Sequence, residues 1–168
     1  MIEDNGGVTA MPAEMTAQQL FDAGMVLFTS GKYKDSISLF TDALTIDPEC
    51  EPVLLSRGSA YMREARMPEA IADFTRAITL NPGRERTYNL RGLAYANLGD
   101  YEKAVSDYTR AIQINPEFSA AYVNRENAVC ELQRLGHHGT KMPQAVETAR
   151  HSRAVFTPPP LPWRNRRA

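Results

Sequence analysis

Histidine and cysteine are the residue types in this sequence that are best suited to bind a metal or to act as nucleophiles. The chain has three histidines, His137, His138 and His151, and two cysteines, Cys50 and Cys130. The histidines could share a metal only if their loop folded onto the last helix, and no cysteine or acidic residue lies near them at ligand spacing. Cys130 is expected to pack against its neighbours. We therefore predict no metal, no cofactor and no catalytic residue.

The motifs of nucleotide-binding proteins and hydrolases are missing. The chain has neither the GxxxxGK[ST] phosphate loop nor the GxGxxG motif, and its serines, histidines and acids suggest no catalytic triad. The pairs Asp73/Arg76 and Asp107/Arg110 have the spacing of exposed ion pairs on helices, each worth about 0.3 kcal/mol. We expect a protein without enzymatic activity.

Charge is distributed unevenly along the 168 residues. The formal net charge of −1 argues against a uniformly basic nucleic-acid binder. Residues 1–50 carry two basic and eight acidic side chains, a net charge of −6, whereas residues 134–168 carry seven basic side chains and one acidic one, a net charge of +6. An electrostatic contact at either end therefore stays open.

The composition indicates an intracellular setting. Two distant cysteines cannot build a disulfide framework, and residues 1–7 lack the apolar run of a secretory signal. No stretch approaches the roughly 20 apolar residues that a membrane span needs. We expect a protein of the cytoplasm, with the nucleus as the alternative, and no membrane span.

Residues 157–168 are rich in proline and arginine. Residues 159–164 match PxxPxR, a pattern that proline-reading domains accept, and they include the only tryptophan, Trp163. This tail is either a ligand for such a domain or a flexible basic end, and its arginines make a weak case for RNA or anionic lipid. Residues 1–15 are predicted to be a flexible N-terminal segment.

Six classes of residue recur every 34 positions. They are Gly24, Gly58 and Gly92; Leu27, Tyr61 and Tyr95; Ser36, Ala70 and Ala104; Phe40, Phe74 and Tyr108; Ala43, Ala77 and Ala111; and Pro48, Pro82 and Pro116. A fixed period of this length indicates a helical repeat array.

The residues of each repeat fit a first helix, a turn and a second helix. In the third repeat, Tyr88, Gly92 and Tyr95 share one helix face because residues four and seven apart are neighbours. Glycine costs a helix about 1 kcal/mol relative to alanine. Its recurrence therefore indicates that the second helix packs closely there, with its aromatic residue filling the gap.

The ends of the helices carry recognisable signals. Thr16 and Gln19 form a capping box that starts the first helix. Gly31 and Gly99 can supply the left-handed backbone that ends a first helix, whereas Ala65 stands at that place in the second repeat. The turn at Ala65 is expected to differ or to be strained.

A fourth unit begins at Ser119 and is degenerate. Glu126 replaces the glycine, so the close helix contact is lost. Residues 66–70 recur as residues 141–145, seven positions later than the period requires, so an inserted loop is expected over 133–140. A cap helix is expected from about residue 143 to residue 155.

This period and residue pattern resembles the tetratricopeptide repeat. Full repeats align at 17–50, 51–84 and 85–118, and residues 119–156 align as a degenerate fourth repeat or cap. The resemblance implies an all-α fold, a right-handed superhelical solenoid of antiparallel helix pairs over residues 16–156. It also implies a concave groove, lined by the first helix of each repeat, that binds segments of other proteins.

Positions that project into this groove are unusually apolar. Contiguous apolar side chains tend to mark an interaction site, and methionine adapts to its ligand. The alternative is that some of these side chains pack against neighbouring helices. The candidate groove residues are Phe21, Met25, Phe28, Leu55, Ser59, Met62, Arg86, Asn89, Leu90, Leu93, Val123, Asn124 and Asn127, with Glu131 further along the fourth first helix.

Family members that act as co-chaperones hold a C-terminal carboxylate with lysine, asparagine and arginine side chains. The corresponding positions here are Phe21, Met25, Ser56, Arg86 and Leu90, and only Arg86 is compatible. Shifting the alignment by one repeat brings no more compatible side chains to the five positions. A charge-assisted clamp needs cations at these points, so the sequence argues against binding of chaperone tails.

The predicted function is therefore protein–protein interaction. An apolar peptide or helix of an unidentified partner would lie in the groove. The competing hypotheses are an electrostatic adaptor that uses the acidic first repeat and the basic tail, and a self-associating scaffold.

Overall fold

Helix follows helix through residues 15–136, the part of the chain that the computed structural model describes. The first three repeats are the pairs α1 (Ala17–Thr29) and α2 (Tyr33–Ile46), α3 (Glu51–Arg63) and α4 (Met67–Leu80), and α5 (Glu85–Asn97) and α6 (Tyr101–Ile114). Helix α7 (Ser119–Gly136) opens the fourth. The predicted all-α class and the three helix pairs are confirmed.

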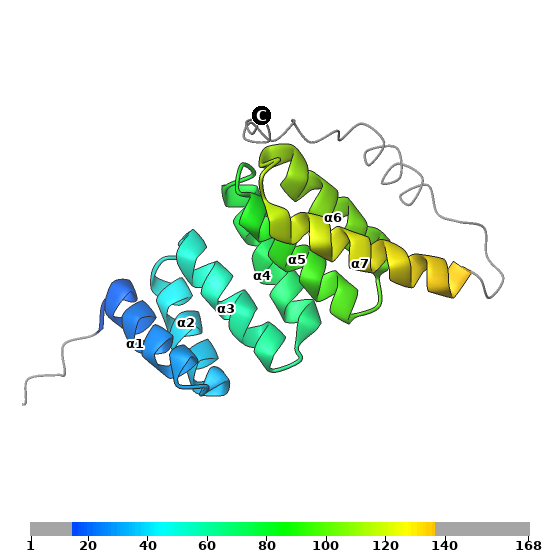
Figure 1. The fold of residues 1–168 in the computed structure, drawn as a ribbon. Coiled ribbons are helices and arrows are strands. Elements are labelled where there is room, and N and C mark those ends of the chain that lie inside the picture. The colour runs from blue at the N-terminus through cyan, green and yellow to red at the C-terminus, as the bar shows by residue number, and fades with distance from the viewer. Residues whose placement is uncertain (1–14, 137–168) are drawn as a thin grey trace, which may run out of the picture. The chain divides into compact units, whose positions relative to one another are not determined.

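The helices belong to two compact units that divide between Pro82 and Gly83. Unit 1 contains α1 to α4 and unit 2 contains α5 to α7 (Figure 1). In each unit, consecutive helices pack against each other. The first helices of neighbouring repeats also touch, α1 against α3 in unit 1 and α5 against α7 in unit 2. Each unit therefore has its own surface built from two first helices.

The repeated glycines lie where the two helices of a repeat approach most closely. A Cβ atom on Gly58 would lie 2.7 Å from Cε1 of Phe74, inside van der Waals contact. The same relationship joins Gly24 to Phe40, at 2.6 Å, and Gly92 to Tyr108, at 2.7 Å. The predicted contact between glycine and aromatic residue is confirmed in all three repeats, and it explains why a helix-weakening residue recurs there.

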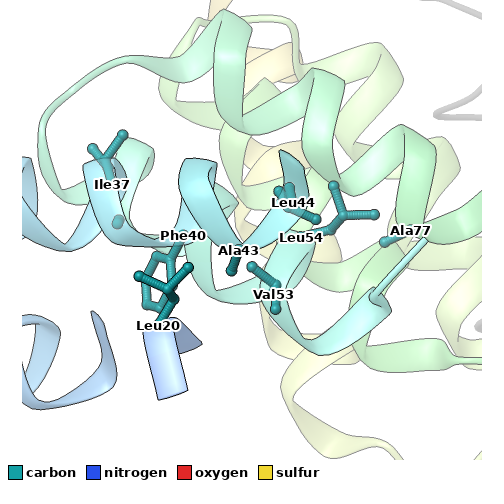
Figure 2. Packing of buried hydrophobic residues seen from close by; sticks show 9 residues of the cluster. Leu20, Ile37, Phe40, Ala43, Leu44, Val53, Leu54 and Ala77 are labelled. Carbon is teal, nitrogen blue, oxygen red and sulfur yellow. The ribbon is translucent and has the colours of Figure 1, made fainter. Parts of the chain in front are cut away.

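Apolar side chains from all four helices form the core of unit 1. Phe40, Ala43 and Leu54 are fully buried, and Leu20 joins them from α1. Figure 2 shows how these side chains gather between the helices, with Ala77 reaching the cluster from α4. In unit 2 the corresponding cluster consists of Ala104, Val105, Tyr108 and Ala128.

Three turns between the helices of a repeat have the same geometry. Gly31 and Gly99 have φ angles of +77° and +79°, and Ala65 has a φ angle of +58°. The expected strain at Ala65 is therefore present, because an L residue with a side chain rarely adopts this conformation. The capping box at the start of α1 is also confirmed: Gln19 N donates to Thr16 Oγ1, and Thr16 N donates to Gln19 Oε1.

Helix α7 is longer than the other first helices. It has 18 residues where α1, α3 and α5 have 13 each. Residues 133–136, which the sequence assigned to an inserted loop, are helical instead, because Gln133 stands where Gly31 and Gly99 turn the chain in the first and third repeats, so no turn signal appears before Gly136. The predicted N-terminal segment, cap helix, histidine loop and proline-rich tail lie outside the described residues, apart from Met15 and the last turn of α7.

Candidate functional site

The apolar groove positions of unit 1 lie at the edge of its core. Phe21, Met25 and Phe28 on α1 and Leu55 on α3 are half-buried, and each packs against the same buried cluster. The ring of Phe21 lies 5.9 Å from the ring of Phe40. One side of these residues therefore supports the core, as the alternative interpretation proposed, while the other side remains open to solvent. We call these four residues the unit 1 apolar surface.

Two further predicted positions lie on α3 near this surface. Met62 is half-buried, and the Ser59 hydroxyl donates to the carbonyl of Leu55 at 2.7 Å. Because that hydrogen bond satisfies the Ser59 hydroxyl within its own helix, Ser59 adds little polarity to the surface.

An aromatic and cationic contact borders the unit 1 apolar surface, and the sequence interpretation missed it. Phe28 meets Tyr33 edge to face, with ring centroids 5.4 Å apart. The Arg63 guanidinium lies 5.1 Å from the Tyr33 ring centroid and donates two hydrogen bonds to the Tyr33 hydroxyl. Tyrosine and arginine 30 positions apart gave no local signal of this contact, because it depends on how the helices of successive repeats pack.

The predicted positions of unit 2 are more polar. Asn89 is buried on α5, and its side-chain oxygen accepts a hydrogen bond from Asn124 Nδ2 on α7 at 2.9 Å. Leu90 and Leu93 are half-buried, Arg86 and Asn127 are exposed, and the Val123 residue is 59% exposed. Asn89 is therefore closed off from the predicted groove and paired within the protein, and the sequence did not foresee its hydrogen bond with Asn124.

A small pocket opens between the three helices of unit 2. Its volume is about 140 Å³, and it is lined by Leu93, Ala96, Tyr101, Tyr108, Asn124, Asn127, Ala128 and Glu131. Four of these residues were predicted groove positions: Leu93, Asn124, Asn127 and Glu131. Tyr101 and Tyr108 come from α6, which the projection of first-helix positions could not include, whereas Ala96 and Ala128 are first-helix residues that the projection left out.

The electrostatics of both units include a repeated buried ion pair that corrects a sequence prediction. Asp73 and Asp107 are buried, and they pair with Arg57 and Arg91 across the two helices of their repeats. The expected exposed pairs with Arg76 and Arg110 are therefore wrong. The Asp73 hydrogen bond raises the pKa of Arg57 above its usual value against the opposing effect of burial. Each pair joins the two helices of its repeat, and neither pair lines the unit 2 pocket.

Other chemistry has little support within residues 15–136. No three histidine, cysteine or acidic side chains gather there as metal ligands, and no described helix has the length and apolarity of a membrane span. Cys50 and Cys130 are free thiols, and Cys130 is exposed rather than packed as expected. Burial, with a smaller effect of Asp107, raises the pKa of Tyr108 to about 12, so its hydroxyl stays neutral near pH 7.

Comparisons with known proteins agree with this architecture. A family model described as tetratricopeptide repeat matches residues 21–85, and a second with the same description matches residues 85–118. Together they span more than half of the chain. None of the curated proteins searched matches it.

Solved structures of tetratricopeptide domains are similar as well. The first such domain of Spaghetti (RPAP3), bound to the HSP90 peptide SRMEEVD, is 29% identical, with a TM-score of 0.68 over 70% of this chain and 94% of that one. The second such domain of human RPAP3, in complex with the HSP70 peptide SGPTIEEVD, is 26% identical, with a TM-score of 0.64 over 67% and 93%. The Sgt2 domain from Aspergillus fumigatus shares the fold at 23% identity, with a TM-score of 0.67 over 79% and 91%.

Proposed function

Because the chain belongs to the tetratricopeptide repeat family, we propose that it is a non-enzymatic interaction module that binds an apolar peptide or helix of a partner protein. Family members of this kind are protein-binding modules. The observation that carries the proposal is the unit 1 apolar surface, where four half-buried apolar side chains meet on α1 and α3. The free thiols of Cys50 and Cys130 suit a cytoplasmic setting.

Side chains that are held by the core on one side and open on the other make good binding surfaces. Their position is fixed before the ligand arrives, so binding costs less conformational entropy than it would for freely rotating side chains. Burying the remaining apolar area contributes roughly 25 cal/mol per Å² before the costs of association. Met25 can adjust its shape to the bound segment.

The proposed ligand differs from those of the similar structures. The two RPAP3 domains are bound to peptides that end in EEVD. In this chain, the positions that correspond to the carboxylate clamp carry Phe21, Met25, Ser56, Arg86 and Leu90. Four of the five cannot pair with a carboxylate as a cation would, and we infer that acidic chaperone tails are not its ligands.

Selection from a random peptide library, with the full chain as bait, tests this proposal. We expect enriched peptides to be apolar, and we expect their affinity to change little between low and high salt because burial of apolar surface dominates. The synthetic peptide SRMEEVD should show no specific binding. Enrichment of acidic C-terminal sequences, or binding that collapses at high salt, would favour the electrostatic alternative instead.

A further inference from the structure

The pocket of unit 2 has apolar walls and a size that suits one side chain. Leu93 and Tyr101 contribute walls from α5 and α6, and Ala128 contributes to the wall on α7. Its volume of about 140 Å³ is close to that of an engineered cavity of roughly 150 Å³ that binds one benzene molecule. A single long side chain of a bound segment therefore fits, whereas a whole helix does not.

Tyr108, one of the lining residues, carries a hydroxyl that has no hydrogen-bond partner among the described residues. Tyr108 is only 1% exposed, and its hydroxyl makes no hydrogen bond with any residue from 15 to 136. Within the same residues, only one side-chain oxygen or nitrogen is both buried from solvent and without a hydrogen-bond partner. That atom is Thr87 Oγ1, so the Tyr108 oxygen is not fully buried. The Tyr108 oxygen therefore keeps a small opening to solvent, and Tyr108 is one of the residues that line the pocket. At the same position in the other two repeats stand Phe40 and Phe74, which have no hydroxyl.

The α7 side of the pocket offers two further acceptors. Asn124 uses its Nδ2 to donate to Asn89, which leaves its Oδ1 available to a ligand. Arg134 contacts Glu131 through Nε and Nη2, and both nitrogens approach Oε2. The other carboxylate oxygen, Oε1, has no partner among the described residues. Arg134 is itself 69% exposed, so this surface ion pair contributes little and does not close the site.

No positively charged side chain lines the pocket. A ligand group that donates hydrogen bonds and carries a positive charge is therefore favoured over an acceptor or an anion. Lysine has an ammonium group with three donors on a flexible four-carbon stem. The lining residues supply three acceptors, as many as the ammonium group has donors, and the apolar walls suit the stem.

We propose that the pocket between α5, α6 and α7 binds a lysine side chain of the partner protein, with the ammonium group at Glu131, Asn124 and Tyr108. This proposal rests on the proposed function, since it names one residue type that the partner presents to the repeats. The charge of that residue is opposite to that of the EEVD peptides in the RPAP3 complexes.

Titration of the full-length, ¹⁵N-labelled chain followed by NMR tests the lysine site directly. The probes are N-acetyl-lysine N-methylamide and N-acetyl-norleucine N-methylamide, which share a four-carbon stem and differ in the ammonium group. We expect the lysine probe to shift the side-chain amide signals of Asn124 and Asn127. Its affinity should be about fivefold higher than that of the norleucine probe, as one ion pair at a partly exposed site allows.

Two variants assign the effect to the pocket. Glu131→Gln should lower affinity for the lysine probe about fivefold and leave the norleucine probe unchanged. Tyr108→Phe should also weaken the lysine probe alone, and it should fold normally because Phe74 packs against Gly58 as Tyr108 packs against Gly92. Glu102→Gln, at an exposed position on α6 outside the pocket, is the matched control and should change nothing.

Equal or tighter binding of the norleucine probe, or the absence of any shift at Asn124 and Asn127, would overturn the lysine site. Neither result bears on the unit 1 apolar surface, which the probes do not need. A failure of the proposed function would appear instead as peptides that bind without any dependence on that surface.

Discussion

Arg57 on α3 donates hydrogen bonds from Nε and Nη2 to the two carboxylate oxygens of Asp73 on α4, at 2.8 and 2.7 Å. Arg91 and Asp107 repeat the arrangement 34 residues later, with both hydrogen bonds at 2.8 Å. A planar guanidinium and a carboxylate that meet through two parallel hydrogen bonds fix each other's orientation. Each pair therefore fixes how the two helices of its repeat lie together.

Removal of one partner should be costly. We expect Asp73→Ala to lower the free energy of unfolding by about 3 kcal/mol, because Arg57 would be left partly buried without its carboxylate. Urea denaturation of the full chain measures this loss. Glu69→Ala is the matched control, since the pair of Glu69 with Arg66 is exposed and its removal should change the free energy of unfolding far less. Equal losses in the two variants would contradict a structural role for the buried pair.

The partners of Asp73 and Asp107 could not be predicted correctly from local sequence spacing. Arg57 and Arg91, like Asp73 and Asp107, recur at the 34-residue period, so the repeat itself contained the signal. The sequence interpretation instead paired Asp73 with Arg76, because residues three apart on a helix are the nearest candidates. Partners 16 positions apart meet only once the two helices have folded back on each other.

Ala65 offers a test of the strain in the second repeat. Its φ angle of +58° matches the turns in which the first and third repeats use glycine. We expect Ala65→Gly to raise the free energy of unfolding by about 0.5–1 kcal/mol, since relief of the strain exceeds the extra entropy of glycine in the unfolded chain. Ala72→Gly, at an exposed site inside α4, should lower it by about 1 kcal/mol. A loss of stability in both variants would show that the turn carries no strain.

Thr87 provides a second way to stabilise the protein. Its Oγ1 is fully buried and has no hydrogen-bond partner within residues 15–136. We expect Thr87→Val to increase the free energy of unfolding by about 1 kcal/mol, because a methyl group replaces an unsatisfied hydroxyl. Val53 already fills this position in the second repeat. Thr109→Val is the control: Thr109 Oγ1 donates to the Val105 carbonyl, so its replacement should bring no gain. Equal effects of the two substitutions in thermal unfolding would refute this reasoning.

Asp100 makes stability depend on pH. It caps α6, and its hydrogen bond with Lys103 lowers the pKa of Asp100 below its usual 3.8. A carboxyl with a lowered folded-state pKa stabilises the protein fully above its unfolded pKa and loses that contribution as the pH falls through the folded value.

Asp100→Asn keeps a helix-capping side chain and removes the charge. The wild-type protein should therefore be more stable than this variant near about pH 6, and the difference should shrink below about pH 4. Unfolding measured across this range checks the prediction. A difference that stays constant with pH would mean that the ion pair with Lys103 does not contribute.

The candidate surfaces were only partly predictable. Period and residue type were enough to locate α1 and α3 and to select Phe21, Met25 and Leu55, because first-helix positions repeat with the helices that carry them. The unit 2 pocket was not foreseen as a whole, since its walls come from three helices. Tyr108 was identified only as a filler of the glycine gap, and its hydroxyl gained significance once the structure showed which residues surround it.

The central claim is that the unit 1 apolar surface binds the partner segment. The most direct test is the affinity of one library-selected apolar peptide for Met25→Glu and for Val26→Glu, each first shown to be helical by circular dichroism. Met25 belongs to the surface, whereas the neighbouring residue Val26 is 65% exposed and lies outside the core cluster. We predict at least about tenfold weaker binding for Met25→Glu, because a charge would have to be buried against the apolar ligand, and unchanged binding for Val26→Glu. Equal affinities of the two folded variants would contradict the claim.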